Sequence, residues 1–344
     1  MKKKKRVIGL LILCFILAAL FMLYTVYQKI FSVAIQKEAP EYLYVPTGMS
    51  YVELLEVIEK ENVIKDMQTF KQLAEYKKLS QKYKAGRYRL QNDMSINDLV
   101  NMLRSGNQEA VKLIFNHIRT KEQLAQKISK QLELEAYDLL NLLNDSVFLA
   151  KYNVNSETAM SIFIPNTYEF WWNTSATGFF ERMYDEYEKY WNKERMSKAE
   201  DIGLSPLQVI ILASIVEEEN YRTDEQARIA GVYMNRLKKG MLLQADPTVK
   251  YVLGDFSIKR LLFKDLEVDS PYNTYMYTGL PPGPIRIPEL SAIAAVLNYE
   301  KHNFLYMCAK EDFSGYHNFA VSARQHAINA NKYHQALNKM KISR

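Results

Sequence analysis

The stretch Leu212–Tyr221, LASIVEEENY, places three consecutive carboxylates directly after an apolar run. The run starts at Leu207 and continues to Val216. Ser205 and Pro206 precede it, and they are a strong helix start because serine can cap free amides and proline at the first helical position loses no hydrogen bond. A helix that is apolar on all sides is typical of the inside of a domain. The sequence therefore predicts a buried helix whose last turn carries acidic groups.

Glu217 falls on the same stripe of this helix as Ile210, Ala213 and Ser214, so its carboxyl is predicted to enter an apolar wall. Desolvation disfavours the charged form, which is the state that a general acid needs near neutral pH. Glu217 and Glu219 are about 200° apart around a helix, which does not fit a close pair of the retaining-glycosidase kind unless the helix ends between them. One working acid is therefore predicted, and the alternative is that all three glutamates form a solvated helix end.

An uncharged apolar segment lies near the N-terminus, from Val7 to Tyr27. At about 1.5 Å per helical residue it just spans a hydrocarbon core of roughly 30 Å. Basic residues precede it and tyrosines stand at its far end, so the pattern predicts one transmembrane helix with a cytoplasmic N-terminus. Everything after it is then expected outside the cytoplasm. A cleaved signal peptide is the alternative, although the run exceeds the usual apolar region of roughly 7–15 residues.

Composition excludes several classes of function. The formal charge is +6, but Lys2 to Lys5 and Arg6 supply five of these charges, so the rest of the chain lacks the basic footprint of a nucleic-acid-binding protein. The chain has two cysteines, Cys14 and Cys308, and an internal disulfide in the external part is therefore excluded. The five histidines show no HExxH pattern and no cysteine pair has zinc spacing, so we expect no metal and no cofactor.

The segment from residue 42 to residue 90 predicts the order strand, helix, helix, strand, from alternating tyrosines at its ends and three- and four-residue apolar spacing between them. Ser50 with Glu53 has capping-box spacing, and a further helix is expected between Ser95 and Gly106. This βααβ order resembles a LysM-like fold, a class that binds glycans containing N-acetylglucosamine. The module could equally serve as a spacer. In the later stretch FIPNTYEFWWNTSATGFF, the aromatic residues are either core or a platform for sugar rings.

Four blocks of the second half together resemble the YceG-type (MltG) endolytic murein transglycosylases. They are LASIVEEEN, GVYMNRLKKGMLLQADPTVKYVLG, DSPYNTYMYTGLPPGPIRIPELSAIAAVL and SGYHNFAVSARQHAIN. The resemblance runs through the whole chain and implies an α+β protein in three parts. These are a basic tail and transmembrane helix (1–28), a LysM-like module (29–108) and a mixed α+β, YceG-like catalytic domain (109–344).

The resemblance places Glu217 at the family's catalytic glutamate, the first acidic residue after SIV, and Glu219 at a second acidic position. The other matching residues that the resemblance places along the glycan cleft are Asn235 and Arg236 in NRL; Gln244, Asp246, Pro247 and Thr248 in LQADPT; Tyr272, Asn273, Thr274 and Tyr275 in YNTY; Gly279, Leu280, Pro281 and Pro282 in GLPPGP; and, as a substrate-binding residue, His317 in the last block. Phe319, Ser322 and His326 match further positions of that block. The alternative for each of these residues is a structural role, in a turn or in a hydrogen bond of the core.

The implied reaction cleaves the β-1,4 bond between N-acetylmuramic acid and N-acetylglucosamine within a peptidoglycan strand and leaves a 1,6-anhydro end. A bacterial cell-membrane anchor, an extracytoplasmic active site and peptidoglycan synthases as partners are likewise implied. Two alternatives stay open. A hydrolytic muramidase would use Asp246 or Glu219 to activate water, and a non-catalytic, anchored glycan-binding scaffold would need only the aromatic residues and the first module.

Overall fold

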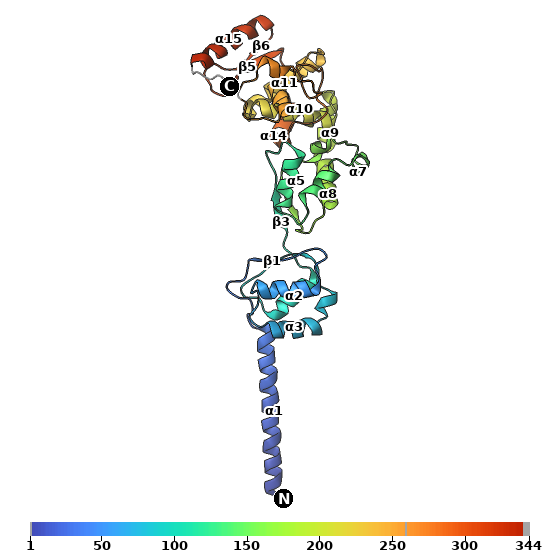
Figure 1. Cartoon of the computed structure of the whole chain (residues 1–344), viewed down its shortest axis with the longest axis vertical. Coiled ribbons are helices and arrows are strands. Elements are labelled where there is room, and N and C mark those ends of the chain that lie inside the picture. The colour runs from blue at the N-terminus through green and yellow to red at the C-terminus, as the bar shows by residue number, and fades with distance from the viewer. Residues whose placement is uncertain (1, 259, 340–344) are drawn as a thin grey trace. The chain divides into compact units, whose positions relative to one another are not determined.

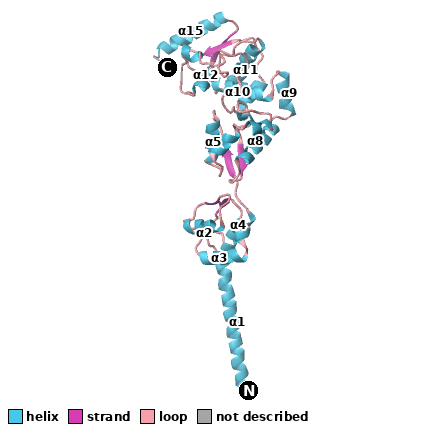
Figure 2. Cartoon of the chain, turned by 45° about the vertical axis from the view of Figure 1, so that its right-hand side comes forward, coloured by secondary structure: helices cyan, strands magenta, loops and turns pink. Residues whose placement is uncertain are grey.

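The computed structural model of the chain describes residues 2–258 and 260–339. It divides into two compact units (Figure 1). The first consists of residues 1–112, 131–133 and 169–174, and the second of residues 113–130, 134–168 and 175–344. Helices dominate both units and the strands form two-stranded sheets, so the protein is a mixed α+β protein (Figure 2).

The first unit confirms the predicted order of strands and helices. Its elements are α1 (Lys2–Phe31), β1 (Tyr42–Val45), α2 (Tyr51–Lys60), α3 (Met67–Tyr76), a 3₁₀ turn (Leu79–Gln81), β2 (Gly86–Arg89) and α4 (Ile96–Ser105). The strands β1 and β2 pair antiparallel, with Tyr42 opposite Arg89 and Val45 opposite Gly86. Ser50 starts α2 with the predicted capping box, and Ser95 and Gly106 bound α4.

Helix α1 is long and apolar enough to cross a membrane, with a mean hydropathy of 2.9 in its most apolar window. None of that window is buried in the structure. After the helix, Ala34 and Ile35 enter the core of the first unit, and Ile30 at the end of α1 packs against it. The side chains of the apolar window therefore have no protein core to cover them, which is consistent with a helix that lies in lipid.

The second unit is mainly helical. Its elements are α5 (Lys121–Ser129), α6 (Ala136–Leu142), α7 (Ser146–Ala150), a 3₁₀ turn (Ala159–Ile162), α8 (Ala176–Tyr190), α9 (Lys193–Asp201), α10 (Pro206–Glu219), α11 (Thr223–Lys238), α12 (Asp246–Leu253), α13 (Phe263–Leu266), α14 (Leu290–Leu297), β5 (Tyr306–Ala309), β6 (His317–Ala320) and α15 (Ala323–Lys339). Two further strands, β3 (Val111–Ile114) and β4 (Thr167–Phe170), also pair with each other.

Helix α10 is the centre of the second unit, as its sequence predicts. The Ser205 side chain caps the first turn, and Gln208 closes the capping box. All residues from Val209 to Glu217 are buried, and α11 and α14 pack against the helix. Because such a helix has no solvent face, its last turn is the first place where polar side chains can gather.

Strands β5 and β6 form an antiparallel hairpin beside α11 and α15. Ala309 lies opposite His317 and Met307 opposite Phe319. Met307 and Phe319 pack against the core around α10. The hairpin therefore brings the C-terminal sequence block to the same core that carries the three glutamates.

The aromatic stretch before α8 divides between core and surface. Phe170 is buried, whereas the Trp171 side chain is 54% exposed. Trp172 is half-buried, and its ring lies edge-on to Tyr44 with 5.0 Å between the centroids. The stretch is therefore neither wholly core nor an open platform.

Candidate active site

The three consecutive glutamates of α10 point to different surroundings. Glu217 is only 2% exposed, whereas Glu218 and Glu219 are partly exposed. Successive residues of a helix are about 100° apart, so three neighbours cannot share one environment. Each carboxyl therefore has to be considered by itself.

Glu217 does not meet a purely apolar wall, and this part of the expectation is corrected. The Arg286 guanidinium lies against its carboxylate, with Nη2 3.0 Å from Oε1, and the backbone N–H of Glu289 donates to Oε2 at 2.6 Å. Burial raises the pKa of Glu217, while Arg286 and the Glu289 N–H act against that rise. The carboxyl that the resemblance places at the catalytic position is thus closed off by two donors.

Arg286 is also the hub of a wider charge network. Its Nη1 lies 2.8 Å from Glu218 Oε1, and its Nη2 is 3.2 Å from His117 Nδ1. Arg119 completes the network with two hydrogen bonds to Glu218, of 3.0 and 3.1 Å. The Arg286 side chain is 1% exposed, and a buried guanidinium needs such partners. The network ties residues 117–119 and 286–289 to the end of α10.

Glu219 has a different environment, and its side chain is partly exposed to solvent. The phenol of Tyr233, a buried residue of α11, donates a hydrogen bond to Oε1. Burial raises the pKa of the Glu219 carboxyl to about 7, and the negative charge of Asp246 adds to the rise. The Tyr233 hydrogen bond and the charges of His317 and Lys250 lower it. A carboxyl with this pKa is partly protonated near neutral pH, as a general acid must be.

Asp246 lies at the start of α12, where the helix N-terminus favours a negative charge. It is exposed, and the Tyr275 phenol donates a hydrogen bond to its Oδ1. Burial and the charge of Asp246 raise the pKa of Tyr275. The structure thus brings together four of the residues that the sequence singled out: Glu219, Asp246, Tyr275 and His317.

Several other predicted site residues serve the fold. The buried Thr248 and Thr274 share a hydrogen bond of 2.9 Å, and Thr274 also accepts from the Ala245 N–H. Asn273 is fully buried and donates to two backbone carbonyls in the segment before it. These three residues fix the loop that contains Tyr275 against the start of α12. They therefore position Tyr275 and Asp246 through buried hydrogen bonds.

Gln244, Tyr272 and Pro282 lie closer to the surface. Gln244 is exposed and adopts a left-handed backbone, with φ +49°. The Tyr272 ring packs on Tyr251, with 5.0 Å between the centroids, and Pro282 is half-buried. The structure gives no hydrogen bond that links these three side chains to Glu219.

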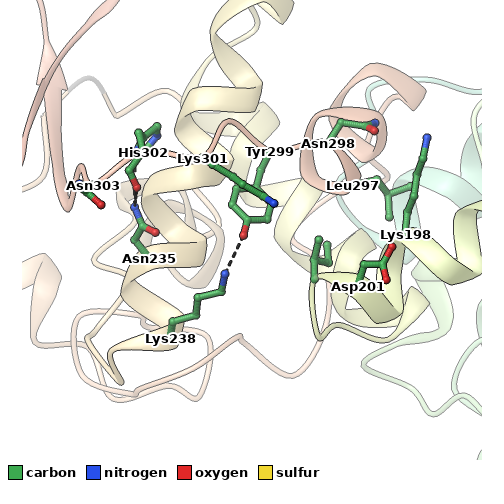
Figure 3. A pocket seen from close by; sticks show the side chains of 11 residues that line it. Lys198, Asp201, Asn235, Lys238, Leu297, Asn298, Tyr299, Lys301, His302 and Asn303 are labelled. Atoms are coloured by element: carbon green, nitrogen blue, oxygen red, sulfur yellow. Dashed lines mark hydrogen bonds between the residues drawn. The ribbon is translucent and has the colours of Figure 1, made fainter.

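Asn235 faces away from the glutamates. Its side-chain amide donates to the carbonyls of His302 and Phe304, at 2.8 and 3.0 Å. It lines a separate cavity of about 780 Å³ (Figure 3). The other lining residues are Lys198, Asp201, Ile202, Lys238, Leu297, Asn298, Tyr299, Lys301, His302 and Asn303.

Two of the lysines of this cavity, Lys198 and Lys238, have a structural explanation. The last turns of α9, α11 and α14 all line it, and each helix end carries partial negative charge. Lys238 also donates to the Tyr299 phenol at 2.7 Å (Figure 3), and Lys198 pairs with Glu194. The cavity therefore does not compete with the Glu219 surroundings as the candidate active site. Across residues 2–258 and 260–339, no three His, Cys, Asp or Glu side chains cluster as metal ligands.

Sequence reasoning missed three residues that shape the site. Tyr233 was hidden in an apolar helix pattern, although a tyrosine on the buried face of a helix needs a hydrogen-bond partner. Arg286 stands between prolines and isoleucines in PPGPIRIP, and an isolated arginine in such a run is a signal of a buried ion pair. Glu225, the partner of His317, follows the helix start without any distinguishing pattern.

Comparison with known proteins decides the family. The sequence profile of the YceG-like family matches residues 43–332. The chain belongs to the YceG-like family. An endolytic murein transglycosylase of Bacillus subtilis is 31% identical over 309 residues, which cover 84% of this chain and 83% of the relative.

Two further matches agree. An endolytic murein transglycosylase of Streptococcus pneumoniae is 30% identical over 295 residues, covering 77% of this chain and 53% of the relative. A crystal structure of a YceG-like protein from Listeria monocytogenes superposes with a TM-score of 0.55 at 30% identity, covering 85% of this chain and 99% of the other. The YceG-like assignment therefore extends over both compact units.

Proposed function

We propose that this chain is an endolytic murein transglycosylase, anchored in the bacterial cell membrane by α1. Membership in the YceG-like family and the names of its relatives support the activity. The observation that carries the proposal is the Glu219 carboxyl, whose pKa is raised to about 7 at the surface end of the central helix. The substrate is the glycan strand of peptidoglycan.

We assign the general acid to Glu219 rather than to Glu217. Glu217 is almost fully buried, and both of its oxygens are occupied, by Arg286 and by a backbone N–H. Burial raises the pKa of Glu217 as well, but Arg286 and the Glu289 N–H act against that rise and occupy the oxygens that would have to reach the substrate. Glu219 is partly exposed and lies beside the negative charge of Asp246, which favours the protonated form. Glu217 then keeps Arg286 in place and fixes the end of α10.

The reaction needs one proton at the departing oxygen and releases one from the attacking hydroxyl. Glu219 protonates the O4 oxygen as its bond to C1 of N-acetylmuramic acid breaks. The C6 hydroxyl of the same sugar attacks C1 and closes the 1,6-anhydro ring, so water is not consumed. Because nucleophile and electrophile belong to one sugar, the attack gains from proximity and needs no protein nucleophile.

The anchor places this chemistry next to newly made strands. Basic residues form the first turn of α1, before its apolar run, and this pattern supports a cytoplasmic N-terminus with the second unit outside. Cleavage there would end the elongation of strands as they leave peptidoglycan synthases, the partners that we propose. We also propose that the βααβ fold of the first unit is LysM-like and that it binds the glycan or acts as a spacer.

A hydrolytic muramidase is the second candidate, and one observation favours it. Asp246 is exposed beside the acid and could activate a water molecule in place of the sugar hydroxyl. A non-catalytic glycan-binding scaffold is the third. The three differ in their products, which makes them separable in one experiment.

The test is mass spectrometry of purified peptidoglycan digested with the full chain in detergent micelles. Internal fragments one water lighter than hydrolysis products are expected. Glu219→Gln should lower the rate by about 10² to 10⁴, the usual worth of general acid catalysis, and should still bind glycan. Glu217→Gln is the matched variant two residues away, and we expect it to retain far more activity. Full-mass reducing ends would make the protein a hydrolase, and no fragments from folded protein would favour the scaffold. A larger loss in Glu217→Gln than in Glu219→Gln would return the acid to Glu217.

A further inference from the structure

A carboxylate–imidazole pair lies beside Glu219, and no step above uses it. His317 Nδ1 is 2.7 Å from Glu225 Oε2, and the His317 backbone N–H donates to Oε1 at 3.0 Å. The Asn220 side-chain amide donates to Oε2 at 2.7 Å. Burial would raise the pKa of Glu225, but the hydrogen bonds from His317 and Asn220 hold it below its usual range. Glu225 is therefore an ionised carboxylate at neutral pH.

The pair fixes the tautomer of the imidazole. A carboxylate only accepts hydrogen bonds, so Nδ1 of His317 must carry the proton that points at Glu225. In the neutral ring Nε2 then has a free lone pair. Among the residues that the structure describes, none forms a hydrogen bond with Nε2. The side chain is 12% exposed, so the ring is held firmly but is not sealed from the surface.

Asn220 connects this pair to the acid. It follows Glu219 directly, and its amide reaches both Glu225 and the Gly315 carbonyl, the latter at 2.9 Å. The loop before β6 is thus tied to the end of α10. These hydrogen bonds hold the Glu225–His317 pair against the residue that directly follows Glu219.

We propose that His317, oriented by Glu225, is the base that takes the proton from the C6 hydroxyl while Glu219 protonates the departing oxygen. This inference rests on the proposed function. The O6–H and C1–O4 bonds break, and the O6–C1 and O4–H bonds form. The imidazolium then releases its proton and Glu219 regains one, so the cycle is balanced without water or a cofactor. A single carboxyl would have to give up its proton before it could accept the second, and a separate base removes that requirement.

The alkaline limb of the pH–rate profile should report Glu219, since an ionised carboxyl cannot donate a proton.

The test measures initial rates of anhydro-end formation by the full chain in detergent micelles between pH 5 and pH 9. His317→Gln should lower kcat by about 10- to 10³-fold with KM little changed, because the variant lacks the base for the C6 hydroxyl. Glu225→Gln keeps the imidazole but removes the carboxylate that orients it, so kcat should also fall while KM changes little. Thermal unfolding of each variant checks that the fold is intact.

Two results would overturn the inference. One is a folded His317→Gln that keeps kcat and raises KM alone, which would make His317 a substrate-binding residue. The other is a folded Glu225→Gln with an unchanged kcat. Failure of the proposed function looks different, because the unmodified chain would then form no anhydro ends at any pH.

Discussion

Replacing Glu219 with glutamine should stabilise the protein at pH 8 and change its stability little near pH 4.5. The reason is the raised pKa of the Glu219 carboxyl, about 7 in the folded chain against an ordinary value of 4.5. The folded state therefore holds the proton more tightly than the unfolded state. Glutamine has nearly the same shape and can still accept the hydrogen bond from Tyr233.

The sign and size follow from proton linkage. Below pH 4.5 both states are protonated and the carboxyl carries no penalty. Between pH 4.5 and 7 the unfolded state releases the proton and the folded state does not, so the free energy of unfolding falls by about 1.4 kcal/mol per pH unit. The full shift would correspond to about 3 kcal/mol, and partial exposure of Glu219 to solvent reduces it. We expect a gain of about 1 to 3 kcal/mol at pH 8.

The measurement is urea unfolding of the full chain in detergent micelles at pH 5 and pH 8. Hydrogen exchange of peptides from α10 and α11 restricts the readout to the second unit. Glu200→Gln is the control, because Glu200 is an exposed glutamate of the same unit. An equal effect at the two pH values, or a loss of stability at pH 8, would refute the assigned environment of Glu219.

Three further predictions concern the surroundings of the acid. Arg286→Met should lower the free energy of unfolding by about 3 to 5 kcal/mol because it leaves the buried Glu217 carboxylate without its cation. Adding Glu217→Gln should recover part of the loss, and urea midpoints without any such recovery would contradict the ion pair. Asp246→Asn should move the alkaline limb of the pH–rate profile to lower pH, because the charge of Asp246 raises the pKa of Glu219. Tyr233→Phe should move the limb to higher pH, because the hydrogen bond from Tyr233 lowers that pKa. Shifts of the two variants in the same direction would contradict the assignment of Glu219 as the acid. Gly283→Ala should lower the free energy of unfolding by roughly 1 to 3 kcal/mol or more, because the added Cβ would lie 2.0 Å from the backbone carbonyl oxygen of Glu157. An unchanged melting temperature would show that the loop can move to make room for it.

Local signals predicted much of the fold. The Ser205–Pro206 start and the apolar run after it defined the central helix, and the capping pairs at Ser50 and Ser95 defined two more. Each of these signals lies within a few residues of the structure that it specifies, because capping and helical periodicity are short-range effects. The strand–helix–helix–strand order of the first unit was predictable for the same reason.

The partners of the glutamates were not predictable in this way. Arg286 reaches Glu217 from a distant loop, and His317 reaches Glu225 from the C-terminal hairpin. Residue spacing within α10 predicts the side of the helix on which each carboxyl lies, but it does not predict which charged side chain lies next to that carboxyl. The predictions that Glu217 is buried and that burial raises its pKa are confirmed, but the prediction of a purely apolar wall was wrong because the buried Arg286 guanidinium lies against the carboxylate.

The adjacency of three glutamates has a physical rationale. A rotation of about 100° per residue sends successive carboxyls into different surroundings while one helix end holds them all. Arg286 neutralises Glu217 and Glu218 on the buried side, so their charges stay paired and the helix end is fixed. Around Glu219, burial and the negative charge of Asp246 outweigh the charges of His317 and Lys250 and raise the pKa to about 7, so the carboxyl is partly protonated near neutral pH. The same short acidic run can therefore supply both the carboxylates that fix the end of α10 and a carboxyl that donates a proton. The chemistry of each carboxyl is set by the side chains that the rest of the chain places around it.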